Sequence, residues 1–271
     1  MRQLEPGSLR WLSSPALSAS AAIHLGAACA TALHPRAWPW ALGAVAANHA
    51  VLTAAGLWPK SRLLGPNWVR LPAASGARGE VAITIDDGPD PAVTLQVLAQ
   101  LDAARAPATF FCVGERVQRH ADLAREIVRR GHSIENHSQR HRHDFSLLGP
   151  AGMRAEIALA QDGISRAVGS APRFFRAPAG LRNPFLDPVL NGLSLKLATW
   201  TRRGFDTVNG NAEIVYRRLA TNLRAGDILL LHDGHAARDA AGRPVILEVL
   251  PRLIGAIRAA GLTPVTLRAA L

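Results

Sequence analysis

Two adjacent carboxylates, Asp86 and Asp87, follow an apolar stretch at residues 81–85. Neighbouring carboxylates at the end of a buried strand repel one another unless a cation or a shared proton relieves the repulsion. A metal ion is the simplest such cation, so the pair indicates a metal site. Gly88 and Pro89 turn the chain directly afterwards, and the alternative is an ordinary turn whose two acids are solvated.

Two histidines four positions apart, His137 and His141, are candidate nitrogen ligands for the same ion. On a helix or a helical turn this spacing points both imidazoles the same way. His132 and His143 fit the spacing less well. Together with Asp87, the pair makes a two-histidine, one-carboxylate set that leaves coordination positions open for water and substrate.

This ligand set predicts one divalent metal ion as cofactor. Zinc suits a mixed imidazole and carboxylate set, and cobalt, nickel or manganese are alternatives. An exposed histidine-rich turn that holds no metal is the other interpretation of the two histidines.

Three further polar residues stand where predicted strands end or shortly afterwards. Arg176 is expected to keep Asp86 ionised through a bidentate contact. His232 ends an apolar strand, where its imidazole is placed to protonate a leaving amine, and Asp206 is placed to hold that imidazole protonated. The alternatives are a surface arginine before a turn and a histidine that bonds only to backbone.

Strand and helix patterns alternate from residue 80 onward, which is typical of a parallel α/β architecture. The carboxyl ends of parallel strands share one edge, so the polar residues above are expected to meet there. We predict a catalytic domain over residues 80–271, preceded by a linker at 71–79. Strands are expected at 81–85, 108–113, 174–175, 195–200, 228–231 and 263–266, and helices at about 92–104, 116–130, 151–168, 212–224 and 245–260.

Residues 1–70 differ from the rest of the chain. They contain two uncharged and mainly apolar runs, 15–33 and 38–58, each long enough to cross a membrane, with Arg36 between them. Both runs are rich in alanine, and close packing of small residues would compensate for their modest hydrophobicity. We predict a membrane-anchoring helical hairpin that is transmembrane. A soluble helical pair covering the catalytic domain is the alternative.

Basic residues predict the orientation of this hairpin, because lysine and arginine collect on the cytoplasmic side of membrane proteins. They flank the hairpin on both outer sides: Arg2, Arg10, Lys60, Arg62 and Arg70. The expected location is the inner (cytoplasmic) membrane with the catalytic domain on the cytoplasmic side. A cleaved signal peptide is the competing interpretation, although its apolar part usually has only about 7 to 15 residues.

The chain carries a net charge of +11, from 31 Lys+Arg against 20 Asp+Glu. Such an excess suits nucleic acid, anionic lipid or an anionic substrate. The arginines are scattered and few aromatic residues accompany them, which argues against a nucleic-acid partner. Membrane lipid is an expected partner, and no obligate protein partner is evident. With only two cysteines, neither a disulfide framework nor a cysteine metal site is expected.

The order of these motifs resembles that of the polysaccharide deacetylase family, carbohydrate esterase family 4, over about residues 80–267. The motifs are ITIDDGPDP, GHSIENHSQRHRH, FFRAPAG and DILLLHDG, with Asp206 between the last two. The resemblance implies a distorted (β/α) barrel and metal-assisted hydrolysis of N-acetyl groups on amino sugars. It assigns Asp86 as catalytic base and His232 as general acid. By the same resemblance Asp87, His137 and His141 are metal ligands, Arg176 orients the base, and Asp206 is the second acid of the fourth motif.

Three positions depart from the family pattern. Arg203 replaces the first acid of the fourth motif, and Thr207 replaces a tryptophan. Ala179 stands where the family often has an aromatic residue whose backbone N–H helps to hold the oxyanion. A backbone donor survives that change, so Pro178 and Ala179 are the expected substrate-contacting and oxyanion-contacting residues. The departures leave the hydrolytic residues intact and affect the expected substrate.

The expected function is removal of an acetyl or formyl group from the nitrogen of an amino sugar. A cytoplasmic catalytic domain favours a lipid-linked or nucleotide-linked sugar, and a periplasmic one favours a cell-envelope glycan. A catalytically silent membrane-bound carbohydrate-binding or scaffold protein of the same fold is the alternative. A glycosidase would leave the histidine pair without a role.

Overall fold

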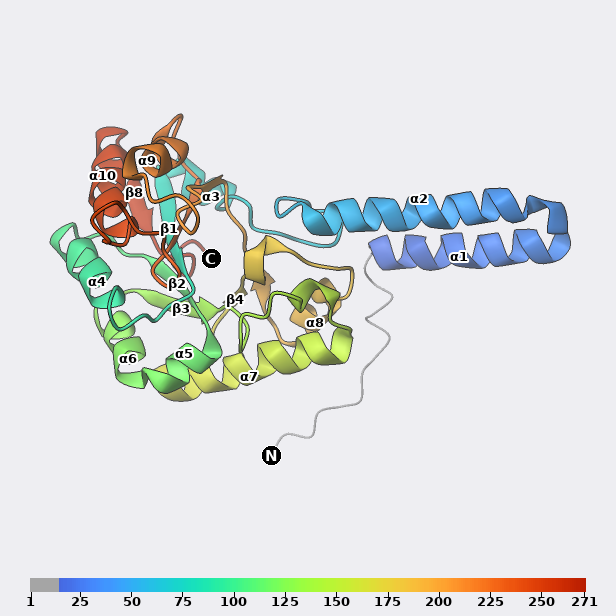
Figure 1. Ribbon diagram of the computed structural model, residues 1–271, viewed down its shortest axis with the longest axis horizontal. Helices are drawn as coiled ribbons and strands as arrows, with labels where there is room; N and C mark the ends of the chain where they lie inside the picture. The colour runs from blue at the N-terminus through green and yellow to red at the C-terminus, as the bar shows by residue number, and fades with distance from the viewer. Residues whose placement is uncertain (1–14) are drawn as a thin grey trace.

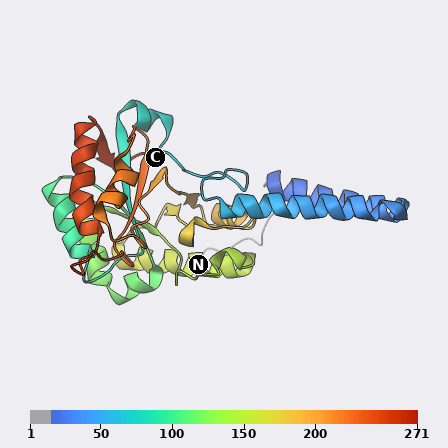
Figure 2. The same cartoon turned by 45° about the horizontal axis from the view of Figure 1, so that its top comes forward.

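The computed structural model describes residues 15–271, which form an α/β domain with a projecting two-helix hairpin (Figures 1 and 2). The domain is built on an eight-stranded sheet in the order β5-β4-β3-β2-β1-β7-β6, with β8 paired to β1 outside this path. All pairings between these strands are parallel. The strands are β1 (Glu80–Asp86), β2 (Thr109–Cys112), β3 (Ser133–Asn136), β4 (Phe174–Phe175), β5 (Lys196–Leu197), β6 (Arg202–Arg203), β7 (Ile228–His232) and β8 (Thr263–Val265).

Helices surround the curled sheet, and the predicted distorted (β/α) barrel is confirmed (Figure 1). Within residues 15–271 no pairing joins β5 to β6, so the barrel is open between these two strands. The helices of the domain are α3 (Ala73–Ala77), α4 (Thr94–Ala103), α5 (Gly114–Arg119), α6 (Ala121–Arg129), α7 (Pro150–Val168), α8 (Leu186–Gly192), α9 (Ala212–Ala220) and α10 (Ile246–Ala259).

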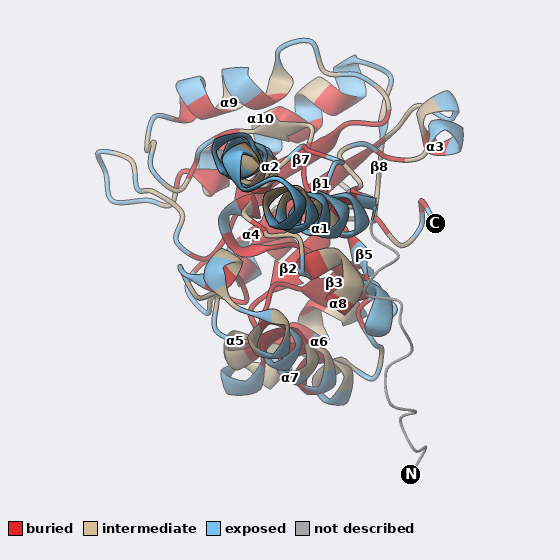
Figure 3. Ribbon diagram, turned by 90° about the vertical axis from the view of Figure 1, so that its right-hand side faces the viewer, coloured by how far each residue is buried: buried red, intermediate tan, exposed pale blue. Residues whose placement is uncertain are grey.

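Burial is complete along the central strands β1 and β7, except at the first residue of β1 (Figure 3). Strands covered on both faces need apolar residues almost continuously, which explains why these two were recognisable in the sequence. Their register places Asp86 beside His232, while the β1–β2 register places Asp86 beside Phe111. The expected base and acid therefore emerge from neighbouring strands at one edge of the sheet.

The strand β3 was not predicted, because its sequence Ser-Ile-Glu-Asn is mostly polar. Its Glu135 is nonetheless completely buried. One carboxylate oxygen of Glu135 accepts hydrogen bonds from the backbone nitrogens of Arg173 (2.7 Å) and Phe174 (2.8 Å), and the other pairs with Arg268. This carboxylate joins the start of β4 to β3, so it fixes the strand that leads into Arg176.

Other element boundaries also differ from the expected ones. The helix expected over residues 116–130 is divided at His120 into α5 and α6. The strand expected over 195–200 is reduced to β5, and β6 and α8 were not foreseen. The segment 71–79, expected to be a linker, contains the short helix α3.

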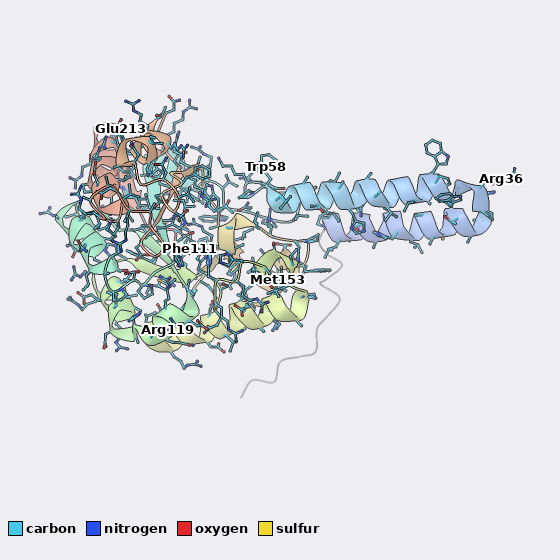
Figure 4. All side chains as sticks on the ribbon, in the orientation of Figure 1. Arg36, Trp58, Phe111, Arg119, Met153 and Glu213 are labelled. Carbon is cyan, nitrogen blue, oxygen red and sulfur yellow. The ribbon has the colours of Figure 1, made fainter. Side chains whose placement is uncertain are left out.

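The hairpin consists of α1 (Pro15–Leu33), a short 3₁₀ turn (Pro35–Ala37) and α2 (Trp38–Leu57). Arg36 lies at its far tip and Trp58 at the end next to the α/β domain (Figure 4). Both helices are long and apolar enough to cross a membrane. In the most apolar 18-residue stretch of each helix, only 6% of the first and 11% of the second is buried. The hairpin therefore does not cover the catalytic domain as a soluble helical pair would.

Polar side chains join the two helices to each other. The Nε2 atoms of His24 and His49 lie 3.2 Å apart, and Asn48 donates a hydrogen bond of 2.9 Å to the hydroxyl of Ser20. Such interhelical bonds between small or polar residues are a usual means of holding apolar helices together. The histidines and the asparagine that weaken the apolar pattern therefore serve the pairing of α1 with α2.

The domain end of α2 is fixed against the loop that follows β4. The carbonyl of Gly56 accepts a hydrogen bond of 3.1 Å from the backbone N–H of Arg182. A Cβ on Gly56 would lie 2.2 Å from the carbonyl oxygen of Arg182, so this approach requires glycine. Lys60 adds a hydrogen bond of 2.6 Å to the carbonyl of Thr201.

Candidate active site and metal centre

A cleft of about 610 Å³ opens at the carboxyl ends of the strands. Its lining includes the expected base Asp86, the three expected metal ligands and the expected acid His232. Residues from β1, β7 and the loops after β3 and β4 therefore meet around one space, as a parallel barrel requires.

The three expected metal ligands converge. The Oδ1 atom of Asp87 lies 3.3 Å from Nε2 of His137 and 3.2 Å from Nε2 of His141. All three candidate ligand atoms lie within 4.8 Å of one another. Oδ1 of Asp87 is buried and has no hydrogen-bond partner within the described residues, which is costly for a carboxylate unless a cation lies beside it. The donor set therefore fits a divalent metal ion.

The two imidazoles are prepared for this role in different ways. His137 donates from Nδ1 to the carbonyl of Arg176 (2.8 Å), which leaves the lone pair of Nε2 free for a metal. Burial, with the neighbouring His137, lowers the pKa of His141 to about 4, so His141 is neutral at pH 7. A metal-ligating histidine must be neutral, and His141 satisfies this condition.

The local structure that presents the two histidines is not the expected helical turn. His137 directly follows β3, and the chain then bends through Ser138 (φ 64°) and His141 (φ 51°). These left-handed conformations bring the two rings together, with centroids 4.8 Å apart. The prediction that both histidines point to one place holds, whereas the helical reason for it was wrong.

His235, which was not predicted as a site residue from the sequence, lies beside the triad. Its Nδ1 is 3.2 Å from Oδ2 of Asp87, the oxygen that does not face His137 and His141. Its Nε2 lies 3.1 Å from Arg116. A hydrogen-bond partner on the oxygen that does not face the metal site orients a ligating carboxylate. The signal was available, since His235 directly follows the DILLLHDG motif and lies three residues after His232.

The carboxylate of Asp86 is held by a buried arginine. Nη1 of Arg176 donates to Oδ1 of Asp86 at 2.6 Å and to the hydroxyl of Thr84 at 2.8 Å. Its Nε and Nη2 donate to the carbonyls of Ala198 and Thr199. The contact with Asp86 is thus made through one oxygen, and the bidentate contact expected from the sequence was wrong. Oδ2 of Asp86 receives no hydrogen bond within residues 15–271.

His232 and Asp206 are joined by two hydrogen bonds. Oδ1 of Asp206 lies 2.8 Å from Nδ1 of His232, and Oδ2 accepts the backbone N–H of His232 at 2.7 Å. Burial works to lower the pKa of His232, but the charge and the hydrogen bond of Asp206 outweigh it and raise the pKa to about 9. His232 is therefore protonated at neutral pH, and its Nε2 is the nitrogen left for a substrate.

Asp233, which directly follows His232, was also not predicted as a site residue from the sequence. It is completely buried, accepts a hydrogen bond of 2.5 Å from the hydroxyl of Thr94, and accepts the N–H of Gly234. Burial raises its pKa to about 7. A Cβ on Gly88 would lie 2.5 Å from this carboxylate, so Asp233 packs against the turn that follows Asp87.

Pro178 and Ala179 form a 3₁₀ turn after β4. Ala179 has a left-handed conformation (φ 54°) and lines the cleft, and its backbone N–H has no acceptor within the described part of the chain. It is therefore available to a substrate oxygen. Pro178 is buried, is absent from the cleft lining, and has no N–H to donate, so its contribution is to shape the turn.

The fold and the site define a barrel of the α/β class with a candidate mononuclear metal centre between an acid and a base. The polysaccharide deacetylase sequence profile matches residues 73–198. A peptidoglycan-N-acetylglucosamine deacetylase of Bacillus cereus is 34% identical over 175 residues, covering 64% of this chain and 81% of the relative. A chitooligosaccharide deacetylase of Bradyrhizobium sp. is 33% identical over 194 residues, covering 69% and 88%. The chain belongs to the polysaccharide deacetylase family.

A solved structure adds a qualification about activity. A pseudoenzyme of carbohydrate esterase family 4 from Bacillus anthracis shares the fold, with a TM-score of 0.64 and 20% identity, covering 71% of this chain and 65% of that one. The fold therefore also occurs in a pseudoenzyme, and activity depends on the residues of the site.

Purified protein is expected to bind one zinc ion, and His137→Ala is expected to weaken zinc binding by roughly 100-fold or more because it removes a ligand. His235→Ala, which removes only a partner of Asp87, should weaken binding by about 10- to 100-fold. Asp86→Asn is the control and should bind zinc as the wild type does. Isothermal titration calorimetry measures all four proteins, and equal affinities would contradict this assignment of ligands.

Proposed function

We propose that this chain is a metal-dependent hydrolase that removes an acetyl or formyl group from the nitrogen of an amino sugar. One observation carries the proposal: Asp86 and His232 lie in the same cleft as the triad of Asp87, His137 and His141. The named activities of the relatives, which are deacetylases of peptidoglycan and of chitooligosaccharides, support the substrate class. Zinc is the proposed metal, with cobalt, nickel or manganese as alternatives.

A divalent cation in the triad would polarise the acyl carbonyl and lower the pKa of a water molecule in the cleft. Asp86 accepts the proton of the attacking water. Its Oδ1 is occupied by Arg176, whereas Oδ2 faces the triad, 3.8 Å from Nε2 of His137. Arg176 thus fixes the carboxylate and leaves one oxygen for the proton transfer.

The negative charge that develops on the acyl oxygen needs a fixed donor. The N–H of Ala179 supplies one, because it lines the cleft and no other group of the described chain accepts its hydrogen bond. His232 then donates a proton from Nε2 to the departing nitrogen, while Asp206 stabilises the imidazolium before the transfer. The products are a free amine and acetate or formate.

A catalytically silent carbohydrate-binding protein is the second candidate, and the pseudoenzyme with this fold is the reason to keep it. The site of this chain argues against it. The base, the acid, the three ligands and a free backbone donor all face one cleft, which a binding protein would not need.

For the location, we propose that the hairpin anchors the chain in the inner membrane with the catalytic domain on the cytoplasmic side. The apolar, exposed and projecting helices support an anchor, and the basic residues Lys60, Arg62 and Arg70 after the hairpin support this orientation. A domain held at the cytoplasmic surface would meet lipid-linked or nucleotide-linked amino sugars. Membrane lipid and an N-acylated, lipid-linked sugar are accordingly the proposed partners.

The reaction is tested by the release of free amine from N-acetylated and N-formylated amino sugars by the zinc-loaded protein. The wild type is expected to release amine, and a chelator is expected to abolish the release. Asp86→Asn should retain zinc and lose about 10²- to 10⁴-fold in kcat, the usual contribution of a general base. Wild-type turnover by Asp86→Asn would remove Asp86 from the mechanism. A protein that binds zinc yet hydrolyses none of the sugars would be the silent form.

The pH dependence tests the acid. His232 must be protonated to act, so kcat/KM should persist up to about pH 9 and fall as the pH rises through that value. Asp206→Asn removes the charge that raises this pKa, and burial then lowers it. The alkaline limb of the profile should therefore move to lower pH, while the acidic limb stays in place. An unchanged alkaline limb in Asp206→Asn would contradict the assignment of His232.

The orientation is tested with reporters fused after Leu271. A reporter that is active only in the cytoplasm is expected to be active, and one that requires the periplasm is expected to be silent. The matched control fuses the same reporters after Arg36, at the tip of the hairpin, where the outcome should be reversed. Periplasmic activity of the Leu271 fusion would overturn the proposed topology and favour a cell-envelope glycan as substrate.

A further inference from the structure

The wall of the cleft carries more positive than negative side chains. Four arginines line it, against three carboxylates, two of which are the candidate base and a candidate metal ligand. Most of these arginines have carboxylates nearby. Arg119 pairs with Glu115 at 2.8 Å, Arg140 lies 3.6 Å from the same carboxylate, and Arg116 lies 4.0 Å from Asp90.

The fourth arginine, Arg203, differs from the others. Within residues 15–271 it forms no ion pair, and its Nε is buried without a hydrogen-bond acceptor. Its guanidinium instead packs against two aromatic rings, 5.3 Å from the centroid of Trp200 and 4.9 Å from that of Phe205. No acceptor of the described chain bonds its Nη atoms either, so these donors remain available to an acceptor from outside the chain.

The position of Arg203 in the sheet places it near the reaction. In the β6–β7 register, Arg203 lies beside Leu230, two residues before His232. Side chains two residues apart on a strand share a face, and paired residues on adjacent strands share it too. All three residues line the cleft. Arg203 therefore lies on the same wall as the proposed general acid.

Two nearby arginines show that this exposure to the cleft is specific to position 203. Arg202, on the opposite face of β6, is neutralised by Asp227 at 2.7 Å. Arg218 packs on Phe205, the same ring that Arg203 contacts, with its guanidinium 5.2 Å from the ring centroid. Arg218 is not part of the cleft lining. Of these three arginines, only Arg203 lines the cleft, and within the described residues 15–271 it forms no ion pair.

We infer that Arg203 binds an anionic oxygen group, a phosphate ester or a carboxylate, of the amino-sugar substrate. A guanidinium presents a planar pair of N–H donors that matches either group, and two flanking rings hold this plane in one orientation. The positive excess of the wall, increased by a divalent cation at the triad, attracts an anion into the cleft. The inference rests on the proposed deacylation and adds a charge requirement to the substrate.

The experiment compares three substrates that carry the same acyl group: the neutral methyl N-acetylglucosaminide, N-acetylglucosamine 1-phosphate and the carboxylate N-acetylmuramic acid. If the enzyme hydrolyses only formyl groups, the N-formyl forms replace them. The full-length, zinc-loaded protein in detergent is assayed for amine release, and kcat/KM is measured for each substrate. The wild type is expected to prefer one of the anionic substrates to the neutral one, and the preferred substrate identifies the group.

Arg203→Gln is expected to lower kcat/KM for the preferred anionic substrate by roughly 10- to 100-fold, the value of a charge-assisted hydrogen-bond pair. Its activity on the neutral substrate should change by less than about threefold, because the substitution leaves the base, the acid and the ligands in place. Arg203→Lys keeps the charge without the planar fork and should give an intermediate loss. Raised salt should reduce the anionic preference of the wild type more than that of Arg203→Gln.

The control variant is Arg218→Gln, which removes a guanidinium from the same aromatic ring outside the cleft and should leave the anionic-to-neutral ratio unchanged. A structural role of Arg203 would lower activity on all three substrates equally, and this result would overturn the inference while the proposed function stands. Equal wild-type activity on anionic and neutral substrates would overturn it as well. If the zinc-loaded wild type released amine from no substrate, the proposed function itself would fail.

Discussion

The buried guanidinium of Arg176 is the constraint on which the rest of the site depends. A charge that is completely removed from water must be paired and fully hydrogen-bonded. Here the partners come from Asp86 and Thr84 on β1 and from the carbonyls of Ala198 and Thr199 after β5. The carbonyl of Arg176 in turn accepts the N–H of His137. One residue therefore fixes the candidate base, one candidate ligand and the relation between strands on both sides of β4.

Electrostatic pairing also separates the roles of the acids around the cleft. Asp86 is held by a guanidinium through one oxygen, Asp87 leaves a bare oxygen toward two imidazoles, and Asp206 is bound to His232 through both of its oxygens. Each carboxylate thus has a different partner set, although the three lie close together. Environment, rather than residue type, therefore distinguishes the proposed base, the candidate cation ligand and the acid that raises the pKa of His232.

The sequence predicted those parts of the fold and site that local patterns encode. The apolar runs of β1 and β7, with polar residues at their ends, are enough to predict Asp86, Asp87 and His232 at one edge of the sheet. Strand β3 was not predicted because its polar Glu135 is paired by groups distant in the sequence, Arg268 and two backbone amides. The backbone path between His137 and His141 was not predicted for a related reason. Its left-handed residues lie in a segment whose carbonyls, at Ser138 and Gln139, accept hydrogen bonds from the distant Gly114 and Glu115. His235 was visible as a residue, but its role depends on a contact across the cleft.

The junction between α2 and the domain has a mechanical consequence. Gly180, next to the free N–H of Ala179, has no room for a side chain, because a Cβ there would lie 2.9 Å from Pro59 and 2.5 Å from Trp200. The end of the hairpin thus packs directly against the turn that is proposed to hold the reacting oxygen. On the proposed topology, this contact sets the distance between the catalytic cleft and the lipid surface. The acyl group of a lipid-linked sugar would reach the cleft only if the linker between sugar and lipid matches this distance. The length of the linker would then contribute to substrate selection together with the chemistry of the cleft.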